Sequence, residues 1–402
     1  MLTKQNIAIL TTSRSEYYQI TPLLDILSKI EMYSCILFVS GSHLSTKFGK
    51  TEEDIKSDNL LPYERLPILL DDDSKLGAVL TAGIAVQMIG SALERNKTDL
   101  LILAGDRYET LAAALAAVSI NVPIAHIHGG ERTDGSIDDI CRHAITKLSS
   151  LHFVSTDVYR KRVIQMGEIP NRVFTVGAPL IDRLMTTPIL QEFVLSKSLG
   201  IKISHPLALV AYHPVTAQKS DDYLVCNHIL ESVAQKCNTI ILTGPNHDSG
   251  YGKILNLLKA YASSCEKTFF FENLGSQLFF SVMACADIMI GNSSSGIHEA
   301  ASFELSVVNV GTRQANRLTP KNVINCNSDR FSIDKAISLA LSDEFKKKIE
   351  GLKNPYGNGH SGKKIVDYLE SFVPFKENLH KIFYDSKEIQ ASISDWNKKY
   401  HA

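Results

Sequence analysis

Cysteine is scarce in this sequence, and its distribution excludes several classes of protein. The 402 residues include seven cysteines, at positions 35, 141, 226, 237, 265, 285 and 326. An odd number of scattered cysteines without a C-x-x-C pair argues against a disulfide framework. We therefore expect reduced and mostly buried thiols, as in a cytoplasmic protein.

Charge of one sign and long apolar runs are also missing. The formal net charge is -1, so nothing in the overall charge favours binding to nucleic acid or to an anionic membrane. No apolar run is expected to approach the roughly 18 residues of a membrane span. The apolar run near the start covers only residues 7–10, which predicts that no signal peptide is present.

What the sequence does contain is a regular alternation of strand-like and helix-like segments. Short apolar runs, typical of buried strands, cover residues 6–12, 35–41, 100–105, 122–130 and 151–156. Helical patterns between them cover residues 18–30, 76–95, 109–120 and 138–150. The alternation restarts in the second half, where strand-like runs cover residues 206–214, 239–246, 287–295 and 305–313.

This order predicts parallel strands joined by crossover helices, an α/β fold with two doubly wound sheets. A chain of 402 residues is too long for one ordinary core, so two domains are expected. We place them at residues 1–180 and 181–370. Residues 371–402 are expected to form a helical tail that packs back on the N-terminal domain.

The distinctive polar residues follow predicted strands, where open α/β sheets bind their ligands. In the first half these residues are Arg14, His43, Asp106 and the segment 126–131, and in the second half they are His213, Asn246, Ser293 and Arg313. The simplest assembly has the two sheets facing each other across a central cleft.

The segment GNSSSG at residues 291–296 lies between a predicted strand and a predicted helix. Its small residues and the free N–H groups of a helix N-terminus suit a phosphate group. Serine is also a good helix N-cap, so a plain capping role stays open. Glu299, one turn further on, lies too far back for phosphates and suits ribose hydroxyls. The spacing does not fit a P-loop.

The segment GDRYE at residues 105–109 also permits two interpretations. Asp106 is either the N-cap of the alanine-rich helix or an acid/base group. Glu131, Asp138 and Asp139 follow the next predicted strand, so a cluster of carboxylates is expected. Such clusters separate the pKa values of their members, as proton abstraction requires.

Three other positions have ordinary alternatives. His126 and His128, with Glu131, have the alternation of a metal site on a strand, but no second ligand pair has suitable spacing, and we expect no metal. His213 is either a buried histidine with satisfied hydrogen bonds or a group beside a phosphate. Arg313 is either a salt-bridge residue or a phosphate ligand.

Taken in order, the motifs resemble one enzyme family. They are SRSEYY at 13–18, GSHL at 41–44, GDRYE, HIHGGE at 126–131, IDDICRHAITKLS at 137–149, GNSSSGIHEA at 291–300 and VVNVGTRQ at 307–314. Together they resemble the hydrolysing UDP-N-acetylglucosamine 2-epimerases of bacterial sialic acid and nonulosonate biosynthesis, from residue 7 to about residue 330.

The resemblance implies a GT-B-like fold, with two Rossmann-like domains facing a deep cleft. It implies conversion of UDP-N-acetylglucosamine and water to N-acetylmannosamine and UDP, without metal or nicotinamide cofactor. The implied mechanism is anti elimination to a 2-acetamidoglucal followed by hydration. The partners would be the UDP-sugar, UDP and further copies of the chain, as a dimer or a tetramer.

The resemblance also implies a role for each matching residue. The catalytic set is Asp106, Glu131, Asp138, Asp139 and His213. The substrate-binding set is Arg14, Tyr18, His43, Arg107, His128, Arg142, Asn246, Leu274, Ser293, Ser294, Glu299 and Arg313. Within the second set, the serines and Arg313 would hold phosphate, the backbone near Leu274 would meet uracil, and His43 would lie near the sugar.

Three points stay open in the sequence. His128 stands where non-hydrolysing relatives have glutamate, which leaves the base of the first step open. UDP-2,4-diacetamido-2,4,6-trideoxyhexose is an alternative substrate, as in legionaminic acid biosynthesis. A GT-B glycosyltransferase and a catalytically silent binder of nucleotide sugars are alternatives of other classes.

Overall fold

The chain folds into two compact units. The computed structural model describes residues 4–46, 51–70, 72, 74–133, 137–215, 221–245 and 251–401. The first unit consists of Met1–Glu131, Ile137–Arg183 and Gly357–Ala402, and the second of Arg132–Ser136 and Leu184–Tyr356. The chain therefore leaves the first unit near the predicted boundary and later returns to it.

The return of the chain corrects the predicted domain limits. Residues 357–370, assigned to the second domain from the sequence, belong to the first unit. The cause is the Asp182 carboxylate, which accepts hydrogen bonds from the backbone N–H groups of Ser361 (2.9 Å) and Gly362 (2.7 Å). These bonds tie the segment after residue 357 to the helix that precedes the second unit.

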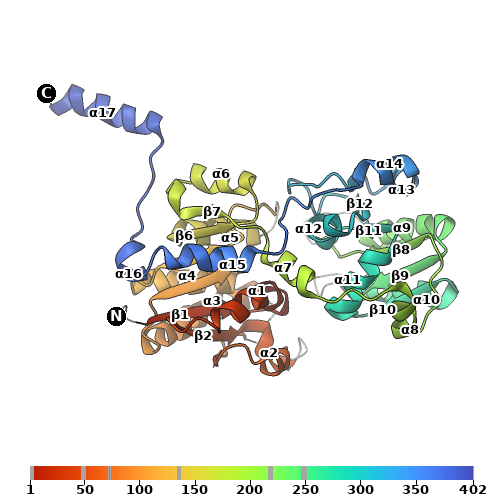
Figure 1. The fold of residues 1–402 in the computed structure, drawn as a ribbon, viewed down its shortest axis with the longest axis horizontal. Helices are drawn as coiled ribbons and strands as arrows, with labels where there is room; N and C mark the ends of the chain where they lie inside the picture. Colours follow the sequence, from red (N-terminus) through yellow and green to blue (C-terminus); the bar gives the residue numbers. More distant parts are fainter. Residues whose placement is uncertain are drawn as a thin grey trace. The chain divides into compact units, whose positions relative to one another are not determined.

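The first unit contains a seven-stranded parallel sheet in the order β3-β2-β1-β4-β5-β6-β7 (Figure 1). The strands are β1 Gln5–Thr11, β2 Tyr33–Ser40, β3 Tyr63–Leu66, β4 Leu100–Ala104, β5 Ile124–Ile127, β6 Leu151–Val154 and β7 Val173–Thr175. All five runs predicted in this half form strands. The short strands β3 and β7 were not predicted, and both lie at sheet edges.

Helices cover both faces of this sheet. The helices of this unit are α1 Arg14–Leu27, α2 Glu52–Asp58, α3 Lys75–Arg95, α4 Tyr108–Ser119, α5 Ile137–Leu148, α6 Asp157–Gln165, α7 Pro179–Thr186, α15 Ser361–Glu370, α16 Phe375–Asn378 and the exposed α17 Lys387–His401. Alternate residues of β1 enter opposite cores: Ile7 and Ile9 pack with α1 and α15, whereas Ala8 and Leu10 pack with α3 and α4. Figure 1 shows α15, in blue, beside α1, in red.

Helix α3 corrects one expectation. By length and composition it is apolar enough to cross a membrane, so the statement that no segment approaches this limit was wrong. Its residues Ala85, Ile89, Ala92 and Leu93 are fully buried in the core of the first unit. A core helix passes the same test, because it too is long and apolar.

The segment after α15 packs on the first unit. The backbone N–H of Phe375 donates to Gln5 Oε1 at 3.1 Å. Further along, Lys381 forms an ion pair with the buried Glu168, and Arg172 donates to the carbonyl oxygens of Asn378 (2.9 Å) and His380. These contacts are made by α16 and by the residues directly after it. Helix α17 is exposed at every described side chain, so the expected packing of the tail is seen for its first part and not for α17.

The second unit contains a six-stranded parallel sheet in the order β10-β9-β8-β11-β12-β13. The strands are β8 Leu207–Ala211, β9 Thr239–Thr243, β10 Thr268–Phe271, β11 Ile288–Gly291, β12 Ser306–Val310 and β13 Val323–Cys326. The helices are α8 Glu192–Leu199, α9 Asp222–Lys236, α10 Tyr251–Ser264, α11 Gly275–Cys285, α12 Ser295–His298, α13 Arg330–Ala340 and α14 Asp343–Ile349. The edge strands β10 and β13 were not predicted.

The first sheet has the strand order 3-2-1-4-5-6-7, and the second, numbered from its own first strand, has the order 3-2-1-4-5-6. The predicted pair of doubly wound, Rossmann-like sheets of a GT-B-like fold is therefore confirmed. In each sheet the direction of winding reverses once, between β1 and β4 in the first unit and between β8 and β11 in the second. Ligands of such sheets bind beyond the carboxyl ends of the strands at this point. The loops after these four strands are therefore the first places to look for a site.

Candidate functional site

The loop after β1 is fixed by a carboxylate that the sequence did not single out. Glu16 Oε2 accepts hydrogen bonds from Thr12 N and from Thr12 Oγ1, both at 2.7 Å. The side chain is buried, and its Oε1 atom has no hydrogen-bond partner in the described part of the chain. Burial raises the pKa of Glu16, and the nearby Arg107 guanidinium opposes this shift.

Asp106, in the loop after β4, lies against the first turns of α5. Its carboxylate accepts a hydrogen bond from Arg142, whose side chain is almost fully buried. Arg142 Nη1 also lies 3.6 Å from Asp139 Oδ1, so one guanidinium joins the two carboxylates. Helix α4 begins at Tyr108 with Arg107 at the N-cap position, so Asp106 is not its N-cap.

Arg107 and Asp138 lie in the same region. The Arg107 guanidinium donates to both carboxylate oxygens of Glu109, at 3.1 and 3.2 Å. Burial lowers the pKa of Arg107, but the negative charges of Glu109, Glu16 and Asp138 outweigh burial and raise it. The predicted carboxylate cluster is therefore assembled around two arginines.

His126 is a structural residue rather than a metal ligand. Its Nε2 atom lies 2.9 Å from the Gly105 carbonyl oxygen, and its Nδ1 atom lies 3.2 Å from Thr146 Oγ1. Burial lowers the pKa of His126 to about 3, so the ring is neutral near pH 7. Since both ring nitrogens are engaged, the metal interpretation of this motif has no support here.

His128 has a different arrangement. Its Nδ1 atom lies 3.0 Å from Glu131 Oε1, which also accepts a hydrogen bond from Ser155 Oγ at 2.9 Å. Its Nε2 atom is buried and has no hydrogen-bond partner among the described residues. The backbone has φ of +69°, a left-handed conformation that non-glycine residues seldom adopt. Such conformations gather at functional sites.

Arg14 and Tyr18 lie on the first two turns of α1. Arg14 Nη2 donates to Tyr18 Oη at 3.4 Å, and Tyr18 Oη donates to Asp54 Oδ2 at 2.9 Å. The guanidinium of Arg183 lies 3.8 Å from the centre of the Tyr18 ring. Arg183 and Asp54 were not predicted as site residues, because no motif contains them.

The structure does not support a direct contact between His43 and a ligand. The side chain is fully buried, with Nε2 at 2.9 Å from Thr11 Oγ1 and Nδ1 at 2.7 Å from Thr51 Oγ1. Burial lowers the pKa of His43 to about 4. His43 therefore joins the loop after β2 to the end of β1 and to Thr51, and its place near the sugar stays a prediction.

In the second unit, the loops after β8 and β11 are held together by one amide side chain. Asn292 Oδ1 accepts from the backbone N–H of His213 at 2.7 Å, and Asn292 Nδ2 donates to the carbonyl oxygen of His213 at 2.8 Å. Burial, with a smaller contribution from Arg313, lowers the pKa of His213 to about 3. His213 is therefore a neutral imidazole beside the second reversal point.

The serine loop opens a helix, as predicted, but this helix is short. Helix α12 is one turn, Ser295–His298, and a 3-10 helix follows at Ala300–Phe303. Ser294 occupies the N-cap position but makes no side-chain cap hydrogen bond, and Ser293 Oγ accepts from Ser295 N at 3.4 Å. Ser293 and Ser294 are both partly exposed. Helix capping alone therefore does not explain these two serines.

Glu299 lies directly behind this loop. Its Oε1 atom accepts a hydrogen bond from Ser295 Oγ at 3.0 Å, whereas Oε2 is buried without a hydrogen-bond partner in the described ranges. Burial raises the pKa of Glu299 to about 7. A carboxyl group of this kind suits a ligand that brings its own hydroxyl donors.

Arg313 reaches the same loop from the end of β12. Its Nη1 atom donates to the carbonyl oxygen of Asn292 at 3.1 Å, and Gln314 Nε2 donates to the same oxygen at 2.8 Å. Leu274 is the N-cap of α11 and lies beyond the end of β10. The predicted residue Asn246 lies outside the described residues.

The chain is similar to known enzymes along most of its length. The sequence profile of the UDP-N-acetylglucosamine 2-epimerase family matches residues 26–370. A GDP/UDP-N,N'-diacetylbacillosamine 2-epimerase (hydrolyzing) of Campylobacter jejuni is 35% identical over 386 residues, covering 96% of this chain and 100% of the relative. A UDP-N,N'-diacetylbacillosamine 2-epimerase (hydrolyzing) of Legionella pneumophila is 32% identical over 377 residues, covering 94% and 98%.

Among solved structures, the UDP-GlcNAc 2-epimerase of Neisseria meningitidis bound to UDP-GlcNAc has a similar fold. It aligns with a TM-score of 0.71 at 19% identity, over 91% of this chain and 100% of the other. The profile match, the two relatives and the fold lead to the same conclusion: the chain belongs to the UDP-N-acetylglucosamine 2-epimerase family.

Proposed function

We propose that the protein is a hydrolysing 2-epimerase of UDP-N,N'-diacetylbacillosamine, a UDP-linked 2,4-diacetamido-2,4,6-trideoxyhexose. The products would be UDP and the free sugar inverted at C2. The two relatives above, each matched over nearly its whole length, carry this activity in their names. This choice replaces UDP-N-acetylglucosamine, the first choice from the sequence, with the alternative substrate.

One observation carries the proposal: each sheet has reactive or anion-binding groups at its own reversal point. In the first unit these are Asp106 with Arg142, and in the second they are His213 with the serine loop. A nucleotide sugar needs both kinds of group, because its diphosphate leaves while a proton is removed from the sugar.

The proposed reaction is an anti elimination followed by hydration. A base removes the C2 proton while the C1–O bond to UDP breaks, which gives a 2-acetamidoglycal and UDP. Water then adds its oxygen to C1, and a proton returns to C2 on the opposite face. Because the C2 proton is weakly acidic, loss of UDP must accompany its removal, and stabilising the leaving diphosphate is the main catalytic contribution.

The second unit would stabilise the diphosphate. Ser293 and Ser294 present partly exposed hydroxyls, and Arg313 lies one hydrogen bond from the same loop. His213, neutral before substrate binds, would donate a hydrogen bond to phosphate rather than a full charge. Glu299 would accept hydrogen bonds from ribose, and the backbone at Leu274 would contact uracil.

The first unit would supply the acid and base groups. Asp106, Asp138 and Asp139 are carboxylates around Arg107 and Arg142, as proton transfer at C2 requires. His128 and Glu131 form a second pair, in which the carboxylate orients the imidazole. If Nδ1–H donates to Glu131, then His128 Nε2 is a proton acceptor, so this pair is the second candidate for the first-step base. Arg14 and Tyr18 would contact the nucleotide.

UDP-N-acetylglucosamine is the second candidate substrate, because the similar Neisseria structure holds that compound. The two sugars differ at C4, where an acetamido group replaces a hydroxyl. They also differ at C6, where a methyl group replaces a hydroxymethyl group. Measuring kcat/KM for both UDP-sugars with the same protein tests the choice. A higher kcat/KM for the diacetamido substrate supports the proposal, and a higher value for UDP-N-acetylglucosamine overturns it.

A further inference from the structure

The amino ends of the strands in the second sheet lie beside a cluster of side chains that the proposed reaction does not use. His205 lies directly before β8, Asp287 directly before β11, Cys285 at the last position of α11 and Glu192 at the first position of α8. These are the amino ends of the strands. Strand β8 separates them from His213 by five strand residues, a distance of about 17 Å. The cluster is therefore separate from the serine loop.

Three side chains of different chemistry converge there. Glu192 Oε2 lies 3.0 Å from His205 Nε2 and 3.5 Å from Cys285 Sγ. All three donor atoms lie within 4.8 Å of one another, and they form the one such group found in the described part of the chain. Bonds of about 2.0–2.3 Å to zinc place tetrahedral ligands roughly 3.3–3.8 Å apart, so small side-chain shifts suffice for binding.

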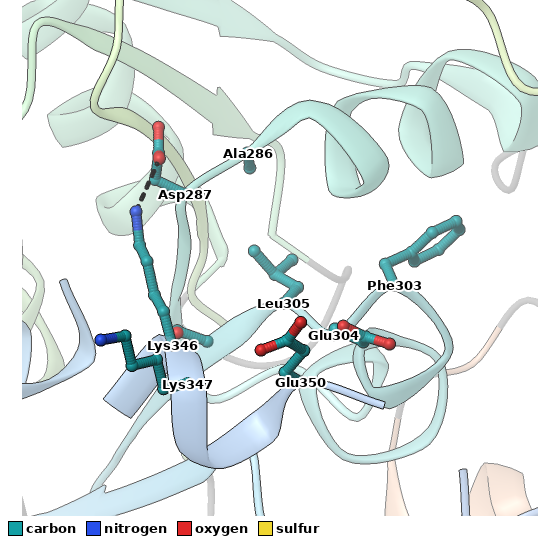
Figure 2. Close-up of a pocket in the computed structure, with 9 residues that line it drawn as sticks. Ala286, Asp287, Phe303, Glu304, Leu305, Lys346, Lys347 and Glu350 are labelled. Carbon is teal, nitrogen blue, oxygen red and sulfur yellow. Dashed lines mark hydrogen bonds and ion pairs between the residues drawn. The ribbon is translucent and has the colours of Figure 1, made fainter. Parts of the chain in front are cut away.

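Asp287 orients the histidine as metal sites commonly require. Its Oδ2 atom lies 2.5 Å from His205 Nδ1 and accepts from the backbone N–H of Leu207 at 2.8 Å. Lys346 Nζ contacts the other oxygen, Oδ1, at 3.1 Å (Figure 2). His205 Nε2 faces Glu192 Oε2 at 3.0 Å, and a bound cation would take the place of the proton shared by these two atoms. A carboxylate that fixes the tautomer in this way is a regular feature of zinc-binding histidines.

Figure 2 shows the Asp287–Lys346 contact at the rim of a pocket of about 340 Å³. Lys347, Glu304 and Glu350 also line this pocket. The side chains of Glu192 and His205 are 51% and 43% exposed, so a metal ion has access from solvent. An exposed carboxylate–imidazole pair contributes little to stability, and the Cys285 thiol adds only a hydrogen bond of 3.5 Å to Glu192.

We propose that Cys285, His205 and Glu192 bind a Zn²⁺ ion, with water as the fourth ligand. Thiolate, imidazole and carboxylate are the ligand types that zinc takes in proteins. The ion joins the start of α8, the start of β8 and the end of α11, and so stabilises the second unit. The ion lies at the amino ends of the strands, whereas the proposed diphosphate site lies at their carboxyl ends. The ion therefore takes no part in the reaction.

Binding requires that Cys285 lose its thiol proton to solvent. The cation must displace this proton when it binds. The carboxylates of Glu192 and Asp287 attract the cation, while the ammonium of Lys346 opposes it.

The test uses the full chain, stripped of metal, with Zn²⁺ or Co²⁺ as the only additions. Cobalt reports thiolate ligation through a charge-transfer band in the near ultraviolet. The parent protein is expected to bind one equivalent, to show the band, and to unfold at a higher temperature with Zn²⁺ than without it. Cys285→Ser is expected to lose the band and to weaken Zn²⁺ binding by more than tenfold.

Cys265→Ser is the matched control, because this thiol is also partly exposed in the second unit but lies after α10, away from the cluster. It is expected to behave like the parent. His205→Gln, which keeps a polar side chain, is expected to weaken binding by at least tenfold. The proposal is overturned if the parent binds no metal, or if Cys285→Ser retains the cobalt band or the parent's zinc affinity.

Discussion

Arg142 on α5 donates a hydrogen bond to Asp106 at the carboxyl end of β4, and it lies 3.6 Å from Asp139 on its own helix. The buried guanidinium thus connects the first reversal point to the helix that carries the aspartate pair. The contact holds the Asp106 carboxylate in the loop after β4, outside the N-cap position of α4, which Arg107 occupies. We propose that Asp106 acts there as an acid or base.

The Asp106 carboxylate is therefore expected to matter for turnover and not for nucleotide affinity. Asp106→Asn keeps the size and the hydrogen bond to Arg142 but removes the charge. We expect kcat to fall by about 10²–10⁴-fold, the usual contribution of a positioned acid or base. Calorimetry is expected to show unchanged UDP binding. Turnover near that of the parent would remove Asp106 from the chemistry.

Ser293 and Ser294 are expected to hold the diphosphate. Each hydrogen bond to a charged group contributes about 1.5–3 kcal/mol, so the double change to alanine is expected to weaken UDP binding by more than tenfold. Uridine, which lacks phosphate, is expected to bind the parent and the variant equally. Unchanged UDP affinity in the variant would mean that the loop does not contact phosphate.

Glu299 predicts a stability that depends on pH. Its pKa is raised from 4.5 to about 7 by burial, so the folded state holds the proton more tightly than the unfolded state. The stabilisation is complete below about pH 4.5 and is lost as the pH rises through about 7. Glutamine resembles the protonated form, so Glu299→Gln is expected to be more stable than the parent at about pH 8, by at most about 3 kcal/mol.

Denaturant unfolding of both proteins at about pH 4 and about pH 8 measures this difference. The two are expected to be similarly stable at the lower pH and to separate at the higher one. Equal stability at both values would show that Glu299 is not buried as described. The same variant is expected to bind UDP more weakly, because the ribose loses its charged acceptor.

Turnover is expected to be independent of divalent metal. His126 uses both ring nitrogens within the protein, and His128 uses one of them to contact Glu131. Prolonged EDTA treatment is expected to leave kcat unchanged while lowering the unfolding temperature, since the proposed zinc ion would be removed from the Cys285 cluster. Loss of kcat that zinc or magnesium restores would contradict the first expectation.

The sequence predicted the alternating architecture well, because long apolar runs and alanine-rich helices have strong periodic signals. It missed the edge strands β3, β7, β10 and β13, which have three or four residues each. Such short strands have no clear alternation. The return of residues 357–370 to the first unit depends on the side chain of Asp182, a tertiary contact without a local signal.

The candidate site was predicted in part. Motif position located Asp106 and the serine loop, because strand ends are predictable and polar residues there are distinctive. The residues that hold these loops, Glu16 and Asn292, lie inside the same motifs but were not singled out, since their partners are backbone groups. The burial of His43 between Thr11 and Thr51 was not predicted either, because burial is a property of the fold and not of the motif.

The central claim is that UDP is eliminated and C2 is inverted with exchange of its proton. Incubation with UDP-N,N'-diacetylbacillosamine in D₂O, followed by NMR of the products, tests it directly. The account predicts free UDP and a free 2,4-diacetamido-2,4,6-trideoxyhexose that is inverted at C2 and carries deuterium there. An uninverted sugar without deuterium would indicate simple hydrolysis, and an epimerised sugar still linked to UDP would indicate a non-hydrolysing enzyme. Either result would contradict the account.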